Sequence, residues 1–340
     1  MQEERRRTWL RRSDRSLAQV HDVAMLDLDG VVYIGRRAVP GVEVHLARAR
    51  RAGLQSAFVT NNASRTPAEV AAHLVELGVP AAAEDVVTSA QAAAHLLRER
   101  LAAGAHVYFL GALGLEEALR AEGLVPVLDR DARPRAVVTG YGPDVPWRRL
   151  MEGAMLVRDG LPWVACNADH TFPTDHGPGP GHGVQVRMIA DFTGVDPTVA
   201  GKPQVPLLDE TVRRVSARRP LMVGDRLDTD IEGAANAGVD SLLVLTGVTG
   251  LAELVAAPPR QRPTYLAPDL AGRTTAHPAP SSTPDGVELG GWRARVADGR
   301  LSVEGRGHVA DWWRVVACGA WRHFDETGTV VAVDGLAPPG

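Results

Sequence analysis

The chain has 340 residues, 45% of them hydrophobic and 23% charged, and a formal net charge of −4. This composition is that of a globular protein large enough for two modest domains, and the charge gives no reason to expect nucleic-acid binding. Two cysteines exclude a disulfide framework and suit a reducing compartment, no apolar run approaches the ~20 residues that span a bilayer, and no signal peptide is recognisable, so we expect a cytoplasmic protein without a membrane partner.

Residues 1–20 form a basic arm with few apolar residues in register. Its arginines are Arg5, Arg6, Arg7, Arg11, Arg12 and Arg15. Charge runs of this kind are usually solvated. The prediction is therefore a disordered or frayed arm, with binding to an anionic partner as the alternative.

Short apolar runs alternate with helix patterns after the arm, and this rhythm predicts parallel strands joined by right-handed crossovers. Thr66 begins the clearest helix, because Pro67 takes the first helical position and Glu69 completes a capping box. Gly78 closes it. The predicted elements are strands at residues 24–28 and 54–59 and helices at residues 42–52 and 66–77.

The same alternation continues through residues 86–190, where it either extends the first sheet or builds an inserted domain. A segment rich in Gly, Pro and His at residues 170–183 is predicted to be a functional or hinge loop. The predicted helices are residues 90–102, 115–122, 147–157, 184–192, 207–215 and 230–237. The predicted strands are residues 106–110, 136–139, 163–166, 220–223 and 241–245.

The last quarter of the chain differs in composition. Residues 257–286 are rich in Pro, Ala, Ser and Thr, which predicts a linker. Residues 287–340 form a small C-terminal extension to which we assign no role, and it packs either on the rest of the chain or on a second subunit. Its predicted elements are strands at residues 293–296, 300–303 and 329–333 and a helix at residues 309–322.

Two aspartates one residue apart end the first predicted strand. Asp27 and Asp29 would lie at its carboxyl end, where open α/β sheets place their sites, and residues i and i+2 of a strand point to one face. Carboxylates this close repel each other, so we expect a compensating cation or a function that uses the repulsion. A plain Asp-x-Asp-Gly turn is the alternative. A calcium loop fits poorly, because Val31 would take a liganding position.

Three further segments place polar side chains at predicted strand ends. They are residues 60–62, the chain's only lysine at Lys202, and the acidic run Asp225, Asp228 and Asp230. Each has a plain explanation on its own: an Asx turn, a surface lysine and helix N-caps. Together, at the carboxyl ends of one sheet, they predict a functional site.

These residue types suit phosphoryl chemistry. Carboxylates at Asp27 and Asp225, with a backbone carbonyl, make a hard oxygen site for Mg²⁺. A phosphoryl group favours that cation, an ammonium such as Lys202, a hydroxyl such as Thr60 and backbone N–H groups near a helix start. Asp27 can attack phosphorus to form an aspartyl-phosphate. Asp29 can protonate the leaving oxygen and then deprotonate the attacking water.

Four motifs, DLDGVVYIG, FVTNNASRT, AGKPQ and VGDRLDTDIEGAANAG, resemble those of the haloacid dehalogenase (HAD) superfamily of aspartate-dependent phosphatases. The resemblance covers roughly residues 22–255 and is closest to subfamily IIA, which holds p-nitrophenyl, phosphoglycolate and pyridoxal-phosphate phosphatases. It implies an α/β fold with a Rossmann-like parallel-sheet core, residues 21–85 and 190–256, and an inserted α/β cap, residues 86–189. It does not cover the basic arm or the tail after about residue 265.

The resemblance also implies roles for the site residues. Asp27 is the nucleophile and a metal ligand, and Asp29 is the acid/base and gives its carbonyl to the metal. Asp225 is a metal ligand, and Asp230 joins the metal site by orienting its water. The implied phosphate-binding residues are Thr60, Asn61, Asn62 and Lys202.

Residues 167–173 match the place where the cap of this family returns to the core and touches substrate. The candidates for substrate contact are Asp169, His170, Phe172 and His176. A structural hinge is the alternative. A zinc site at His170, His176 and His182 is disfavoured, because no cysteine pair accompanies these histidines.

We therefore predict a Mg²⁺-dependent hydrolase of phosphoric monoesters (EC 3.1.3-type), a phosphatase that acts on a small phosphorylated metabolite. Two alternatives stay open: a mutase that transfers the phosphoryl group to another hydroxyl, and a catalytically silent protein that binds a phosphorylated ligand. The oligomeric state is also open, with a homo-oligomer as one possibility. The physiological substrate is not predictable from this sequence.

Overall fold

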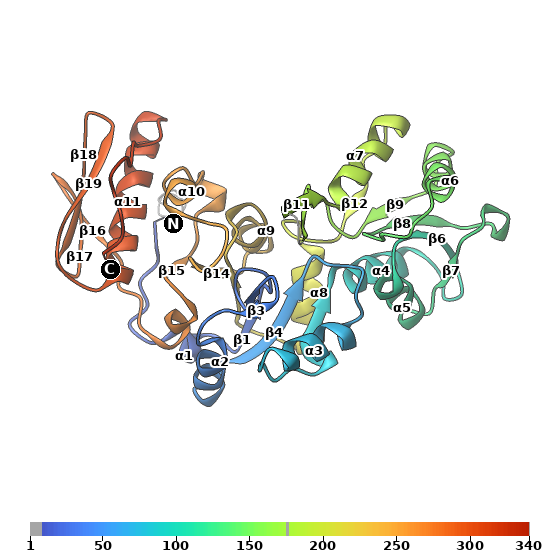
Figure 1. Cartoon of the computed structure of the whole chain (residues 1–340), viewed down its shortest axis with the longest axis horizontal. Helices are drawn as coiled ribbons and strands as arrows, with labels where there is room; N and C mark the ends of the chain where they lie inside the picture. Colours follow the sequence, from blue (N-terminus) through green and yellow to red (C-terminus); the bar gives the residue numbers. More distant parts are fainter. Residues whose placement is uncertain (1–8, 175–176, 340) are drawn as a thin grey trace. The chain divides into compact units, whose positions relative to one another are not determined.

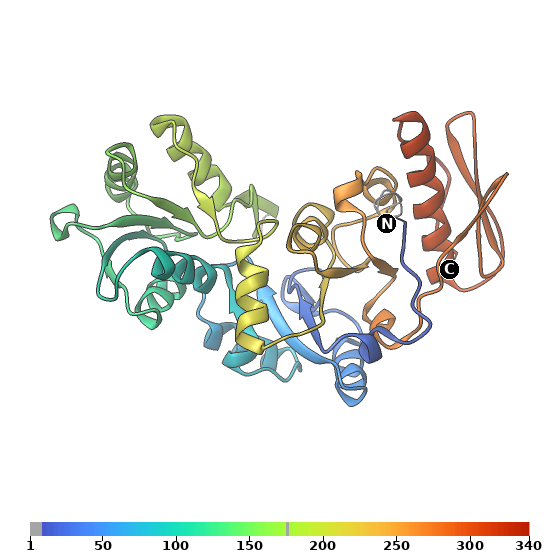
Figure 2. The ribbon, with the colours of Figure 1, turned by 180° about the vertical axis from the view of Figure 1, so that it is seen from behind.

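The computed structural model describes residues 9–174 and 177–339. The chain divides into two compact units (Figures 1 and 2), and each is described by itself. Unit 1 combines Met1–Ser56 with Ala217–Gly340, and unit 2 is Ala57–Ser216. No helix among the described residues is long and apolar enough to cross a membrane.

A parallel sheet forms the centre of unit 1. Its strands, in spatial order, are β15 (Tyr265–Ala267), β14 (Asp240–Val244), β13 (Pro220–Gly224) and β1 (Val23–Leu26). Every residue of β1 is buried, as expected for a parallel strand covered on both faces. This sheet confirms the predicted α/β class with a Rossmann-like core.

Short helices and a small hairpin complete the first part of unit 1. The helices are α1 (Leu17–Val20), α2 (Val42–Arg51), α9 (Glu232–Ala237) and α10 (Leu251–Val255), and the hairpin is β2 (Tyr33–Ile34) with β3 (Arg37–Ala38). A π-helical turn, η4 (Leu227–Ile231), precedes α9, where the sequence predicted one continuous helix from residue 230. Such turns are frequent at functional sites.

A second sheet, antiparallel, belongs to the C-terminal extension. It runs β16 (Ser281–Thr283), β17 (Gly286–Leu289), β18 (Trp292–Ala297) and β19 (Arg300–Gly305), with α11 (Val309–Thr327) lying against it (Figures 1 and 2). The two predicted strands and the helix in this region are confirmed. The predicted strand at residues 329–333 is wrong, because only Ala332 bridges to Arg300.

One hydrophobic cluster joins the extension to the rest of unit 1. It includes Leu10, Leu243 of β14, Leu266 of β15 and Trp321 of α11. Trp321 is fully buried, and its indole N–H donates to the carbonyl of Leu254 (2.8 Å). The extension therefore packs on the body of its own chain.

The prediction of a linker at residues 257–286 was wrong. This segment contains β15 and the 3₁₀ helices Pro259–Gln261 and Leu270–Thr274, and Tyr265, Leu266 and Ala267 are buried. A high content of Pro and Ala is typical of a linker. In this segment, however, prolines lie between short elements that contribute buried residues to the core.

The described part of the basic arm is also ordered, contrary to prediction. Leu10 is buried, the Arg11 N–H donates to the carbonyl of Thr264 (2.9 Å), and Ser13 bridges to His277. Residues 1–8, with three of the arginines, lie outside the described residues.

Unit 2 contains a five-stranded parallel sheet. Its strands, in order, are β12 (Thr198–Val199), β9 (Trp163–Ala165), β8 (Ala136–Thr139), β6 (His106–Leu110) and β7 (Val125–Val127). β4 (Gln55–Thr60) also pairs in parallel with β5 (Val86–Thr88). The helices of the unit are α3 (Pro67–Glu76), α4 (Ser89–Arg100), α5 (Leu113–Ala121), α6 (Trp147–Arg158), α7 (His182–Thr193) and α8 (Pro206–Val215).

The Thr66 capping box of α3 is confirmed. Thr66 Oγ1 accepts from the Glu69 N–H (3.2 Å), and Glu69 Oε2 accepts from the Thr66 N–H (2.7 Å). The segment predicted as a loop at residues 170–183 instead contains the hairpin of β10 (Thr171–Thr174) and β11 (Gly177–Pro180) and the first turn of α7.

Unit 2 is larger than the predicted cap. It also includes residues 57–85 and 190–216, which the sequence assigned to the core. The division into a core and a cap at residues 86–189 stays a prediction.

Candidate active site

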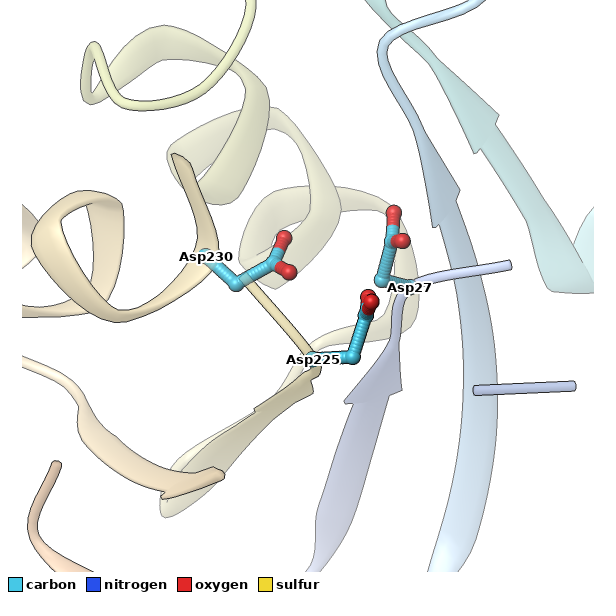
Figure 3. Close-up of side chains that lie close together, drawn as sticks. All are labelled: Asp27, Asp225 and Asp230. Atoms are coloured by element: carbon cyan, nitrogen blue, oxygen red, sulfur yellow. The ribbon is translucent and has the colours of Figure 1, made fainter. Parts of the chain in front are cut away.

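Three aspartates come together in unit 1, as Figure 3 shows. One carboxylate oxygen from each of Asp27, Asp225 and Asp230 lies within 4.8 Å of the others, and no other such group of three acidic, His or Cys side chains occurs among the described residues. Asp225 and Asp230 are fully buried, and Asp27 is partly exposed.

The parallel pairing of β1 with β13 produces this arrangement. Leu26 lies opposite Val223, and the Asp27 N–H continues the ladder by donating to the Val223 carbonyl (2.9 Å). Asp27 and Asp225 therefore leave the carboxyl ends of neighbouring strands, the edge where open α/β sheets bind ligands. The η4 turn then brings Asp230 back to the same point.

Backbone N–H groups hold the two buried carboxylates. Asp225 Oδ2 accepts from the Val248 N–H (2.6 Å), and Asp230 Oδ2 accepts from the Arg226 N–H (3.1 Å). Thr249 Oγ1 donates to the backbone carbonyl of Asp225 (2.5 Å), which ties the segment after β14 to the end of β13. Such donors stabilise negative charge in a buried site.

Glycines make room for these carboxylates. A Cβ on Gly30 would lie 2.3 Å from Asp225 Oδ2, one on Gly247 would lie 2.0 Å from the same atom, and one on Gly224 would lie 2.3 Å from Asp230 Oδ2. Gly30 also has φ = +79°, a conformation that favours glycine. We call Gly30, Gly224 and Gly247 the glycine cradle.

The acid cluster fits a divalent cation. Three carboxylates this close are a costly arrangement in a buried site unless positive charge joins them. Carboxylate oxygens with remaining positions for water or substrate oxygens match the preference of Mg²⁺. A cation would lie among Asp27, Asp225 and Asp230, with the glycine cradle behind the carboxylates.

Asp29 lies outside the acid cluster. It is exposed, and its backbone bridges to Tyr33 at the start of β2. Its side chain is thus open to solvent, and its carbonyl as a metal ligand stays a prediction.

The predicted phosphate-binding residues lie in unit 2, and Asn61 connects them. Asn61 Oδ1 accepts from the Lys202 N–H (2.8 Å), while its Nδ2 donates to the Lys202 carbonyl (3.0 Å) and to Asp169 (3.0 and 3.2 Å). The Asn61 carbonyl accepts from Ser89 Oγ (2.6 Å) and from Asn167 Nδ2 (2.7 Å). The side chain of Asn61 therefore orders the backbone around Lys202 and the carboxylate of Asp169.

Asn62 forms the Asx-type turn that the sequence left open. Its Oδ1 accepts from the N–H and the hydroxyl of Ser64 (both 2.9 Å), and its N–H donates to Thr60 Oγ1 (3.1 Å). Thr60 is buried at the carboxyl end of β4. Lys202 is only 3% exposed, so the explanation as a plain surface lysine was wrong.

Only part of the candidate substrate loop contacts the predicted phosphate-binding residues. Asp169 joins Asn61, His170 is exposed, and the ring of Phe172 stacks on Tyr141 with centroids 4.8 Å apart. His176 lies outside the described residues. His182 is buried beside the Asn167 carbonyl (2.8 Å), and burial lowers its pKa to about 4.

Sequence reasoning missed the glycine cradle and Ser89, and it included Asn167 in the candidate substrate loop without assigning it a role. A usable signal existed for Gly247, because Thr246-Gly247 follows β14 at the same edge of the sheet as Asp27 and Asp225. The hydroxyl of Thr246 donates to the Gly30 carbonyl (2.5 Å), so this strand end belongs to the same site.

Comparisons with known proteins agree with this geometry. The family model of haloacid dehalogenase-like hydrolases matches residues 24–125, and a second, HAD-hydrolase-like model matches residues 199–272. The D-glycerol 3-phosphate phosphatase of Mycobacterium tuberculosis is 46% identical over 87% of this chain and 82% of its own length. An acid sugar phosphatase of Staphylococcus saprophyticus is 35% identical over 68% of this chain and 88% of its own length.

Solved structures extend the likeness to the whole fold. Glycerol phosphate phosphatase from M. tuberculosis in complex with magnesium superposes with a TM-score of 0.83 at 45% identity, covering 91% of this chain and 92% of that one. The p-nitrophenyl phosphatase from Archaeoglobus fulgidus gives a TM-score of 0.69 at 26% identity and covers 75% of this chain and 98% of that one.

The solved structures cover different fractions of this chain. The calcium complex of the M. tuberculosis phosphatase covers 96% of this chain, so it must include most of residues 287–340. The A. fulgidus enzyme leaves about a quarter of this chain without a counterpart. On the sequence, the fold and the acid cluster, the chain belongs to the haloacid dehalogenase-like hydrolases, subfamily IIA.

Proposed function

We propose that this chain is a Mg²⁺-dependent phosphatase that hydrolyses small-molecule phosphate monoesters through an aspartyl-phosphate at Asp27. The observation that carries the proposal is the convergence of Asp27, Asp225 and Asp230 within 4.8 Å at the carboxyl ends of β1 and β13. The magnesium complex of the M. tuberculosis relative supports the choice of cation.

The residues of the chain divide the chemistry between them. The Asp27 carboxylate attacks phosphorus, the ester P–O bond breaks, and Asp29 gives its proton to the leaving oxygen. Asp29 then accepts a proton from the water that attacks the phosphoryl group, and orthophosphate leaves Asp27. Mg²⁺, when bound, supplies charge stabilisation for the phosphoryl oxygens. The exposure of Asp29 suits a group that exchanges protons with solvent.

We assign phosphate binding to Thr60 and Lys202, and a positioning role to Asn61. Asn61 was a phosphate-binding candidate, but its Nδ2 donates to the Lys202 carbonyl and to Asp169, and its Oδ1 accepts from the Lys202 N–H. Its contribution is then to fix the Lys202 backbone, which sets where the ammonium can reach. Asn62 contributes by shaping the turn after Thr60.

The substrate class follows from the relatives. Their names, glycerol phosphate, acid sugar and p-nitrophenyl phosphatase, share a phosphate monoester of a small hydroxyl compound. D-glycerol 3-phosphate is the first compound to test, because the relative named for it matches 87% of this chain.

The test is turnover of D-glycerol 3-phosphate and p-nitrophenyl phosphate by the full chain, with Mg²⁺ and with EDTA. We expect activity only with Mg²⁺, and a loss of about 10²-fold or more in kcat for Asp225→Asn. Asp228→Asn is the matched control, because Asp228 lies in the same loop but is exposed and bonds to Arg226 (2.8 and 3.1 Å). Full turnover by Asp225→Asn would overturn the assignment.

The covalent step has its own test. Acid quenching with ³²P-labelled substrate should trap a hydroxylamine-sensitive label on the wild-type chain and none on Asp27→Asn. Transfer of the label to another hydroxyl of the substrate, without release of orthophosphate, would identify a mutase. Binding of phosphate compounds without turnover would identify a silent ligand-binding protein.

A further inference from the structure

Unit 1 contains a cavity of about 500 Å³ away from the acid cluster. It lies where β13, β14 and β15 begin, at Pro220, Asp240 and Tyr265. The acid cluster lies at the opposite, carboxyl end of the sheet. Pro220 and Asp225 are separated by the length of β13, about 16 Å at 3.3 Å per residue. The cavity is therefore distinct from the proposed active site.

Guanidinium groups dominate its wall. The charged and titratable lining residues are Arg11, Arg12, His21, Arg218, Arg219, Asp240 and Tyr265. Four arginines thus face one carboxylate, and a concave surface with an excess of one sign of charge concentrates ions of the other sign.

Half of these arginines already have partners. Arg11 binds both carboxylate oxygens of Asp240 (2.7 and 2.6 Å), and Arg12 Nε binds Asp14 (2.7 Å). Arg218 and Arg219 are exposed, and neither guanidinium forms an ion pair with a described residue. The nearby carboxylate of Asp22 instead accepts from their backbone N–H groups (3.0 and 2.9 Å).

His21 supplies an observation of a different kind. It is only 7% exposed, and no hydrogen-bond partner of its Nε2 occurs in the described structure. Its Nδ1 lies 3.3 Å from the Arg219 carbonyl, which requires the proton on Nδ1. Burial lowers the pKa of His21 and outweighs the effect of Asp240, whose Oδ2 lies 3.9 Å from Nε2 and favours the protonated ring. The ring is therefore neutral, and Nε2 presents a lone pair at the cavity wall.

We propose that this cavity is a second, non-catalytic site for a phosphate group, free or as a monoester. Arg218 and Arg219 donate to its oxygens, since guanidinium forks match phosphate geometry. His21 Nε2 accepts from a P–OH of the ligand or from a neighbouring hydroxyl. The site thus offers donors from Arg218 and Arg219 and an acceptor at His21 Nε2. It should therefore bind phosphate, which carries an O–H at neutral pH, more tightly than sulfate, which carries none.

The test uses the full-length Asp27→Asn variant in EDTA, which prevents turnover and removes the metal from the proposed active site. Any phosphate binding that Thr60 and Lys202 still support there should not depend on Arg218 or Arg219. Calorimetric titration at pH 7.5 with inorganic phosphate, with D-glycerol 3-phosphate and with sulfate gives three affinities. We expect saturable phosphate binding, at least about fivefold tighter than sulfate. The tighter of the two phosphate ligands identifies the source of the group.

Two variants and a control locate the site. Arg219→Gln and Arg218→Gln should each weaken phosphate binding about tenfold, and Arg48→Gln, an exposed arginine of α2 outside the cavity, should leave it unchanged. His21→Gln should reduce the preference for phosphate over sulfate. The proposal is overturned if phosphate does not bind at 10 mM, or if binding survives both arginine substitutions in chains whose circular dichroism matches the parent.

Discussion

The side chain of Asn61 and the backbone of Lys202 form a reciprocal pair of hydrogen bonds, from the Lys202 N–H to Asn61 Oδ1 (2.8 Å) and from Asn61 Nδ2 to the Lys202 carbonyl (3.0 Å). The second proton of the same Nδ2 reaches Asp169. Within unit 2, the side-chain amide of Asn61 therefore orders both the backbone of Lys202, the chain's only lysine, and Asp169 of the candidate substrate loop.

Asn61→Asp should destabilise the chain and reduce turnover together. The new carboxylate has no donor for the Lys202 carbonyl and repels Asp169, so we expect a loss of about 2–4 kcal/mol in the free energy of unfolding. Urea unfolding measures it. Asp169→Asn in the same chain should restore part of the loss, with a coupling of at least ~1 kcal/mol. Stability within 0.5 kcal/mol of wild type, as for an ordinary surface change, would contradict the positioning role.

Gly30→Ala should weaken Mg²⁺ binding. The new Cβ would lie 2.3 Å from Asp225 Oδ2, so the carboxylate or the backbone has to move. We expect a fall of about 10-fold or more in Mg²⁺ affinity, the range seen when groups supporting a metal site are disturbed. The measurement is the dependence of turnover on Mg²⁺ concentration.

Substitutions at two other glycines distinguish crowding of the Asp225 carboxylate from backbone strain. Gly35 also has a positive φ (+58°), but nothing lies within 4 Å of its added Cβ, so Gly35→Ala should lose some stability and keep its Mg²⁺ affinity. Gly247→Ala introduces the clash with Asp225 and should resemble Gly30→Ala. Equal Mg²⁺ affinity in all three variants would rule out the glycine cradle as a determinant of metal binding.

Asp325→Ala should destabilise unit 1 by about 3 kcal/mol, because it leaves a buried charge without its partner. Asp325 on α11 forms a two-pronged ion pair with Arg262 (2.7 and 2.8 Å), whose side chain is 1% exposed and lies over the ring of Trp321. The control is Asp334→Ala, since Asp334 is 82% exposed and 3.8 Å from Arg300, and it should change stability by less than 0.5 kcal/mol. Thermal unfolding that cannot tell the two variants apart would refute this account.

Stability should fall as the pH drops from about 6.5 to about 4. Burial lowers the pKa of His182 and of His277 to about 4, with Arg314 adding to the effect at His277. Both rings are neutral in the folded chain, while the unfolded chain takes up protons below about 6.5, so unfolding is favoured as pH falls. Each histidine contributes up to about 3 kcal/mol of this loss.

The measurement is the free energy of unfolding at several pH values for the wild type and for His277→Gln. Removing one buried histidine should reduce the slope between pH 6 and pH 4.5, and His182→Gln should do the same. An unchanged slope in both variants would assign the acid sensitivity to other groups.

The acid cluster was predictable because it depends on simple topology. Asp27 and Asp225 each follow a short apolar run, and parallel neighbouring strands necessarily bring their carboxyl ends to one edge. Asp230 was assigned to the site only through the resemblance to the family, because the π-helical turn that brings it there was not predicted. The Thr66 capping box was predictable for the same kind of reason, since it is entirely local.

Other features depended on three-dimensional detail. The glycine cradle needs the distance between Gly30 and Asp225, which are far apart in sequence. The positioning role of Asn61 can be recognised only from the partners of its side-chain hydrogen bonds. In sequence, an Asn-Asn pair is as typical of a turn as of a ligand contact. The error at residues 257–286 had a different origin, because composition does not reveal that Tyr265 and Leu266 add a strand to the sheet.

The arrangement of the hydrophobic cluster in unit 1 has a consequence for synthesis on the ribosome. Leu10 and Trp321 belong to the same cluster, although more than 300 residues separate them. Unit 2 is continuous in sequence and can fold as soon as Ser216 has left the exit tunnel. The hydrophobic cluster of unit 1 cannot be completed until α11 has been translated. A nascent chain stalled before α11 would therefore carry a complete unit 2 and a unit 1 whose apolar residues around Leu10, Leu254 and Leu266 lack the helix that covers them.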